Sequence, residues 1–199
     1  MITVAIERDA EDVREYIDVA SPAHPSLIDT DRVLADRYNM VNVPTVVWID
    51  EQGRIVRPND IAFTTEAGGN YANVSTDDQM QLLRDWVRGD LEAKSPSEVR
   101  ALQSLPSADD QFARAHFGLG NWLWREGRGE AAARHFTRGG DLAPHDFMIR
   151  RGTMRMVGQD PFGDPFREMV TAWRDAGNDY YHPLPSSRRG REGQDDTAR

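Results

Sequence analysis

The sequence has 199 residues, of which 39% are hydrophobic and five are tryptophan, which is enough apolar surface for folded cores. No apolar run approaches the ~18 residues that span a bilayer, and no basic segment followed by an apolar one stands at the start. The absence of cysteine excludes disulfides, thiolate metal sites and thiol chemistry. Residues 1–91 hold 17 acidic and 8 basic side chains, whereas residues 92–199 hold 16 of each, so the acidic first part argues against nucleic-acid binding.

Residues 1–91 are predicted to alternate between short strands and helices. The first predicted elements are a strand at 2–6, a helix after Asp9, a break at 21–25 and a short extended piece at 26–29. A helix that carries Val33, Leu34 and Tyr38 comes next, followed by strands at 45–49 and 54–57. A loop over 58–74 and a helix after Thr76 complete this part of the chain. Thr76 and Gln79 stand at the spacing of a capping box, which predicts the start of the last helix. We expect the strands at 2–6, 45–49 and 54–57 to form one sheet with an uncovered face.

Residues 95–182 are predicted to be helical, with about five helices. Ser95, Pro96 and Glu98 combine an N-cap, a first-turn proline and a glutamate that can reach back to the cap. Two antiparallel helices are expected over 113–146, followed by helices at 147–157 and 167–176. The stretch 183–199 is rich in Ser, Gly, Arg and Asp, and we expect it to be disordered.

The run Val41–Asp50, Val-Asn-Val-Pro-Thr-Val-Val-Trp-Ile-Asp, is followed by Glu51-Gln-Gly-Arg-Ile-Val56. Together these residues resemble the proline loop and closing β-hairpin of the TlpA/ResA-like thiol–disulfide oxidoreductases, a family of redoxins with a thioredoxin-like fold. The resemblance covers about residues 1–91 and implies the C-terminal part of such a domain. The paired-cysteine motif that makes the family enzymatic is absent here.

The same resemblance implies a role for the proline loop. In the family the peptide bond before this proline is cis, and the loop offers its backbone to an extended peptide. Carried over to this sequence, Val43, Pro44 and Thr45 would form a peptide-binding loop. The alternative is an ordinary trans proline at the head of a strand.

Residues 113–146 resemble a tetratricopeptide repeat, in which small and large apolar residues at fixed offsets let two helices cross closely. The residues at those offsets are Leu119, Gly120, Leu123, Gly127, Ala132, Phe136 and Pro144, and the resemblance implies that all of them except Gly127 are packing positions. The sequence departs from the pattern in the two aromatic slots, which hold His116 and Leu123. The alternative is a generic helical hairpin with small residues at its contact.

The remaining chemistry of the sequence is limited. Arginines cluster around the central hairpin at 125, 128, 134 and 138, either as an acceptor for an acidic peptide or as a solvated face. The five histidines show no metal-ligand spacing, and no nucleophile elbow or phosphate loop is present. We therefore expect no catalytic residue, no metal site and no cofactor.

The expected fold class is α/β followed by all-α: an incomplete thioredoxin-like domain at 1–91, a tetratricopeptide-like helical domain at 92–182 and a disordered tail at 183–199. The expected function is a protein-interaction scaffold without a redox centre, or a truncated gene product. The alternative is a thiol–disulfide oxidoreductase whose Cys-x-x-Cys or selenocysteine motif lies upstream of Met1. Expected partners are proteins or peptides, or a second copy bound through the uncovered sheet face, with no nucleic acid and no membrane span. The sequence as written predicts a cytoplasmic location, and an upstream start would allow an extracytoplasmic one.

Overall fold

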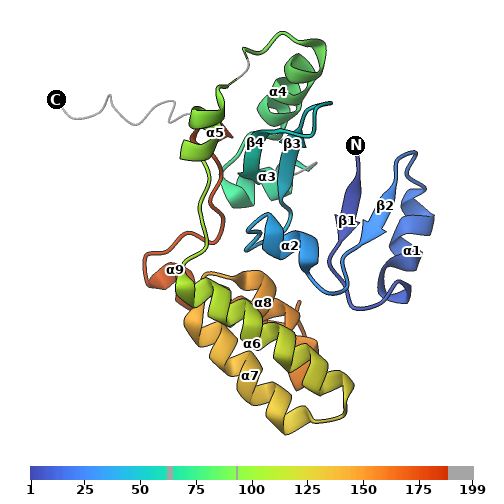
Figure 1. Cartoon of the computed structure of the whole chain (residues 1–199), viewed down its shortest axis with the longest axis vertical. Coiled ribbons are helices and arrows are strands. Elements are labelled where there is room, and N and C mark those ends of the chain that lie inside the picture. Colours follow the sequence, from blue (N-terminus) through green and yellow to red (C-terminus); the bar gives the residue numbers. More distant parts are fainter. Residues whose placement is uncertain (62–64, 93, 188–199) are drawn as a thin grey trace, which may run out of the picture. The chain divides into compact units, whose positions relative to one another are not determined.

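The computed structural model describes residues 1–61, 65–92 and 94–187 and shows a mixed α/β protein (Figure 1). Its contacts divide the chain into two compact units. Unit 1 contains Met1–Val41 and Leu105–Phe166, and unit 2 contains Asn42–Ser104 and the chain from Arg167 onward. Each unit therefore draws on both sides of residue 91. The sequence-based division into domains at 1–91 and 92–182 stays a prediction.

Unit 1 begins with a small β-α-β arrangement. Strand β1 (Thr3–Ala5) and strand β2 (Ser26–Ile28) pair in parallel, with Thr3 opposite Ser26, and helix α1 (Glu11–Ala20) connects them. Parallel neighbours require a crossover connection, and α1 provides it. A short helix, α2 (Val33–Arg37), follows; the side chain of Asp29 accepts the backbone N–H groups at its start.

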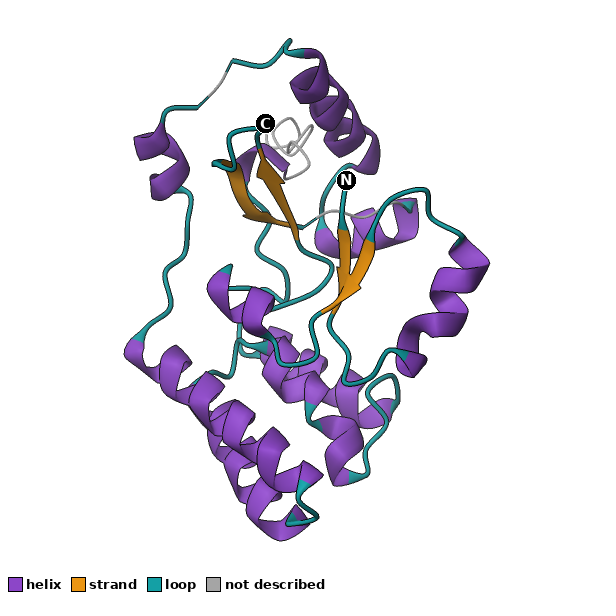
Figure 2. Ribbon diagram, turned by 45° about the vertical axis from the view of Figure 1, so that its right-hand side comes forward, coloured by secondary structure: helices purple, strands orange, loops and turns teal. Residues whose placement is uncertain are grey.

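Unit 2 contains an antiparallel hairpin of β3 (Val46–Ile49) and β4 (Ile55–Asp60). Gly53 in the turn has φ of 75°, a conformation that favours glycine. The expected single sheet is wrong for the described part of the chain, where the strands form two separate pairs (Figure 2). The partner of β1 is β2, a strand of only three residues that is too short to show an alternating pattern.

Three helices of unit 2 follow the hairpin: α3 (Glu66–Ala72), α4 (Thr76–Arg88) and α5 (Pro96–Ala101). The predicted loop over 58–74 is therefore wrong where β4 extends to Asp60 and where α3 forms. The glycines that suggested a loop include Gly69, which is buried in α3. A Cβ there would lie 2.9 Å from the carbonyl oxygen of Val74, so glycine permits a close approach.

The helix starts were predicted with different success. The capping box of Ser95 and Glu98 is confirmed, with both reciprocal hydrogen bonds present. The cap of α4 is Ser75 and not Thr76; its hydroxyl accepts the backbone N–H of Asp78. Both are hydroxyl residues, and only the first adopts the extended cap conformation.

Trp86 of α4 stacks on Trp48 of β3, with ring centroids 5.0 Å apart and ring planes at 23°.

The predicted disordered tail is wrong for its first five residues, 183–187, whereas residues 188–199 lie outside the described part. A short 3-10 helix, η2 (Pro185–Ser187), lies against β4. Asp60 accepts the backbone N–H of Leu184 at 2.9 Å, and Arg57 donates to the Ser187 hydroxyl at 2.6 Å and to Asp60 at 2.7 Å. Composition missed this segment because its order depends on two hydroxyls and a single leucine meeting a buried ion pair.

The helices of the second half of the chain are α6 (Ala108–Arg125), α7 (Gly129–Leu142), α8 (Phe147–Gly152) and α9 (Asp164–Asp175), with the 3-10 helix η1 (Met154–Val157) after α8. The helix predicted at 147–157 thus ends as a 3-10 helix, and the one predicted at 167–176 starts three residues earlier. In unit 1, α6 and α7 lie side by side as an antiparallel pair, and α8 packs on both (Figure 1). None of the described helices has the length and apolar character that crossing a membrane requires.

The α6–α7 contact is built around one ring. Phe136 of α7 is buried against Gly120 of α6, where a Cβ would lie only 2.5 Å from the ring, and its centroid is 6.1 Å from that of Phe117. Ala132 and Ile149 are completely buried in the same cluster. Because Gly120 has no side chain, the Phe136 ring fills the space beside its backbone.

A buried ionic cluster ties the N-terminal part of unit 1 to these helices. Arg32 is 5% exposed, has φ of 59° and lies over the ring of Phe117 at 4.8 Å. Its guanidinium is 3.6 Å from Asp146 and 3.5 Å from Asp36, and Arg114 lies 3.7 Å from the same Asp36 oxygen. Burial raises the pKa of both carboxyls above their ordinary value. The positive charge of Arg32 therefore compensates the negative charges of Asp36 and Asp146.

A matched pair of glycines tests the α6–α7 packing. Gly120→Ala should destabilise the protein by about 1–3 kcal/mol, because the new methyl group overlaps the Phe136 ring. Gly118→Ala, on the same helix with open space around it, should stabilise by up to about 1 kcal/mol through helix propensity. Urea unfolding of both variants measures the difference. Equal effects would mean that Phe136 does not fill the space at Gly120.

A second prediction concerns the ionic cluster. Arg32→Met should cost about 3 kcal/mol of unfolding free energy, because it leaves the buried carboxylate of Asp146 unpaired. Adding Asp146→Asn should recover part of that loss, since the amide keeps the cap to Ile149 without the charge. The matched control is Arg37→Met, an exposed arginine of α2. If the control destabilises as much as Arg32→Met, the cluster is not the cause.

Candidate functional site

The proline loop is held by its own chain. The Val43–Pro44 peptide bond is cis, as the resemblance implied. The Asn42 side chain accepts the backbone N–H of Val43 at 2.9 Å, and the Thr45 hydroxyl donates to the Asn42 carbonyl at 2.6 Å. The carbonyl of Val43 accepts the Tyr181 hydroxyl at 3.0 Å. Both backbone groups that Val43 would offer to a peptide are therefore engaged within unit 2.

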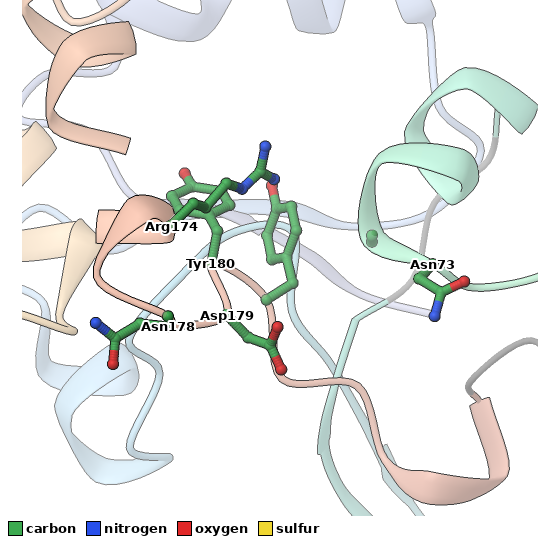
Figure 3. A pocket seen from close by; sticks show the side chains of 8 residues that line it. Asn73, Arg174, Asn178, Asp179 and Tyr180 are labelled. Carbon is green, nitrogen blue, oxygen red and sulfur yellow. The ribbon is translucent and has the colours of Figure 1, made fainter. Parts of the chain in front are cut away.

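A polar hollow of about 380 Å³ lies beside this loop in unit 2 (Figure 3). The described residues that line it are Ala72, Asn73, Arg174, Gly177, Asn178, Asp179, Tyr180 and Tyr181. Arg174 lies over the ring of Tyr180 at 5.8 Å, with Asn73 on the opposite side of the hollow. These lining residues include no cysteine, serine, threonine or histidine, so no Ser–His or Cys–His nucleophile–base pair lies among them.

The residues predicted from the repeat pattern fall into two groups. Gly120, Leu123, Ala132 and Phe136 are buried in unit 1, and Gly120 and Phe136 touch. Pro144 is exposed just after α7 ends, and Gly127 occupies the turn between the helices with φ of 73°. Leu119 was expected to pack and is instead 44% exposed. It points away from α7 because Gly120, its neighbour, takes the position facing Phe136.

Leu119 belongs to an exposed apolar face on α6. Its members share a spacing of four and three residues and are all exposed: Ala108, Phe112, Ala115, Leu119 and Trp122. We call these five residues the α6 face. Phe112 is 61% exposed and Trp122 52% exposed, which is unusual for such large apolar side chains. The repeat comparison missed this face, although the alternating spacing is visible in the sequence and is that of a helix–helix seam.

A histidine pair lies at the edge of the α6 face. His116 stands four residues after Phe112 and three before Leu119, so it neighbours both on the helix surface. Its Nδ1 atom lies 2.8 Å from Nδ1 of His135 on α7. A contact of this length requires one ring nitrogen to donate and the other to accept, so at least one ring is neutral. Burial, then the positive charges of His135 and Arg138, lower the pKa of His116 below its ordinary value of 6.5.

The arginines of the central hairpin lie in different settings. Arg125 pairs with Asp31 at 3.1 Å in an exposed ion pair. Arg134 and Arg138 are exposed on α7, one turn apart, and Arg138 is close enough to His116 to affect its ionisation. Within the described residues, no group of three or more potential metal ligands comes together. The histidine pair is therefore not part of such a group.

Comparison of the chain with models of known protein families, with curated proteins and with solved structures finds no match.

The histidine pair predicts a pH-dependent stability. Because the folded state lowers the pKa of His116, its contribution is complete above pH 6.5 and is lost as the pH falls below that value. The free energy of unfolding should therefore decrease between about pH 7 and pH 5.5, and His116→Gln should show a smaller decrease. His182→Gln, at an exposed histidine, should keep the slope of the unsubstituted protein. Urea unfolding at several pH values measures these slopes; identical slopes for all three proteins would contradict the assignment.

Proposed function

We propose that this chain is a non-enzymatic protein-binding scaffold and that its α6 face receives a helix of a partner protein. The observation that carries the proposal is the exposure of Phe112, Leu119 and Trp122 on one helix at seam spacing. Burial of each of these side chains in an interface would contribute about 1.5–3 kcal/mol. Three such side chains along about 15 Å of helix provide a central apolar anchor of the kind that protein interfaces use.

The shape of the face favours a helical partner. Large side chains alternate along it with small ones, since Ala108, Ala115 and the adjacent Gly118 lie between Phe112, Leu119 and Trp122. Apart from the chain neighbours of Gly118 and the backbone of its own helix, no atom of the described residues lies within 4 Å of the position of a Cβ there, so the surface is open. Knobs of a partner helix can enter the spaces above the small residues, as in helix–helix packing by interdigitation.

The chemistry of the chain supports binding over catalysis. The sequence contains no cysteine, so it cannot exchange a disulfide. The described residues that line the polar hollow in unit 2 include no Ser–His or Cys–His pair, and the proline loop beside it is bonded to Tyr181. A thioredoxin-like origin of residues 1–91 and a tetratricopeptide-like origin of the α6–α7 pair remain part of this proposal. The order of the β-α-β unit and the hairpin supports the first origin. The Gly120–Phe136 contact supports the second.

The test uses a synthetic 21-residue helical peptide with leucines at the same four- and three-residue spacing and uncharged residues elsewhere. It should bind the protein, and Phe112→Ser/Trp122→Ser should weaken binding by at least about tenfold, because two anchors are lost. The matched control is Tyr16→Ser/Val19→Ser, which removes two exposed apolar side chains from α1. Isothermal titration calorimetry measures the affinities, and circular dichroism verifies that the variants are folded.

Two outcomes would contradict the proposal. The first is absence of peptide binding, or equal binding by the Phe112/Trp122 variant. The second is a dimer of the unsubstituted protein that the same double substitution dissociates, which would assign the face to a second copy of this chain. Light scattering after size-exclusion chromatography distinguishes the dimer.

A further inference from the structure

One flank of the α6 face is basic and titratable. His116 stands beside Phe112 and Leu119, and it contacts His135 of α7. Arg138 is exposed on α7 and is close enough to act on the ionisation of His116. In helix pairs, the residues that flank an apolar seam select the charge of the partner.

We propose that the partner helix carries acidic residues beside its apolar seam, and that its binding loads a proton onto the His116–His135 pair, so that binding strengthens as the pH falls. This inference rests on the proposed function, because it names the partner and the regulation of the same α6 face.

The geometry of the pair gives the proton step. In the free protein one imidazole donates its Nδ1 proton to the other across 2.8 Å. When solvent supplies a proton to the accepting Nδ1, both Nδ1 atoms become N–H donors, and the contact between them must open. The Nδ1–H of His116 can then donate to a carboxylate of the partner helix, which compensates the added charge.

The charges around the pair favour this exchange. On α7, His135 and Arg138 face His116, and both oppose its protonation while no partner is bound. On α6, Asp110 is already paired with His145, which precedes α8, at 3.2 Å. The exposed Asp109 of the same helix stands seven residues, or two turns, before His116. Among the described residues, no carboxylate contributes to the pKa shift of His116, and a partner can supply one.

The direction of the pH effect follows from linkage. Burial, His135 and Arg138 lower the pKa of His116 in the free protein. A partner carboxylate raises it, so the complex holds more protons than the free protein in the interval between the two pKa values. Affinity therefore increases as the pH falls through that interval. A shift of one pKa unit corresponds to about a tenfold change in affinity.

The experiment uses two peptides with the same leucine seam, one flanked by glutamates and one by lysines. The glutamate peptide should bind roughly five- to tenfold more tightly at pH 6.0 than at pH 7.5, and the lysine peptide should bind more weakly than the glutamate peptide at both. Calorimetry in two buffers of different ionisation enthalpy should show net proton uptake with the glutamate peptide. This measurement needs only the unsubstituted protein.

Substitutions locate the effect. His116→Gln/His135→Gln should remove both the proton uptake and the pH dependence, whereas His24→Gln/His182→Gln, which changes histidines outside the pair, should keep them. Circular dichroism at each pH verifies that the protein is folded. Binding of the glutamate peptide without pH dependence or proton uptake would overturn this inference and leave the proposed function intact. Failure of the glutamate, lysine and uncharged peptides alike would overturn the proposed function itself.

Discussion

The contact between Phe136 and Gly120 sets the arrangement of unit 1. It brings α6 and α7 close enough for the rings of His116 and His135 to meet, with their centroids 5.0 Å apart. It also fixes the rotation of α6 about its own axis. Because Gly120 and Phe117 face inward, Leu119 and Phe112 must face outward. The exposed apolar face is therefore a direct consequence of how the helix is packed on its other side.

Among the described residues, each unit contains one buried arginine, and this arginine holds distant segments together. Arg32 lies over Phe117 at 4.8 Å and faces Asp146, and Arg57 lies over Trp48 at 5.2 Å and faces Asp60. The aromatic rings cover faces of the guanidinium groups that carry no hydrogen-bond donors.

The two arginines differ in how their donors are satisfied. Arg57 makes direct hydrogen bonds to Asp60, Ser186 and Ser187. Arg32 makes ion pairs at 3.5–3.6 Å, and its guanidinium nitrogens make no direct hydrogen bond within the described residues. The Arg57 cluster is therefore the more completely satisfied of the two, and it holds a segment that composition alone marked as disordered.

Local signals predicted local features. The Ser95–Glu98 capping box, the turn at Gly53 and the burial of Phe136 beside Gly120 all follow from short spacings that the sequence displays. Pairings between distant residues were beyond reach, because no spacing links β1 to β2 or Asp60 to Ser187. The candidate site could be predicted only in part from the sequence. Leu119 was recognised as part of a motif, but its neighbours on α6 were not, since the repeat pattern assigned the apolar residues of this helix to one face.

The stack of Trp48 on Trp86 gives unit 2 an optical property of its own. Two indoles whose centroids are 5.0 Å apart are close enough for their electronic transitions to couple, and we expect a circular dichroism signal that isolated tryptophans lack. The other described tryptophan of unit 2, Trp173, donates its indole N–H to the carbonyl of Asp179, and Trp122 and Trp124 belong to unit 1. The packing of β3 against α4 can thus be observed spectroscopically in the intact chain, separately from events at the surface of α6.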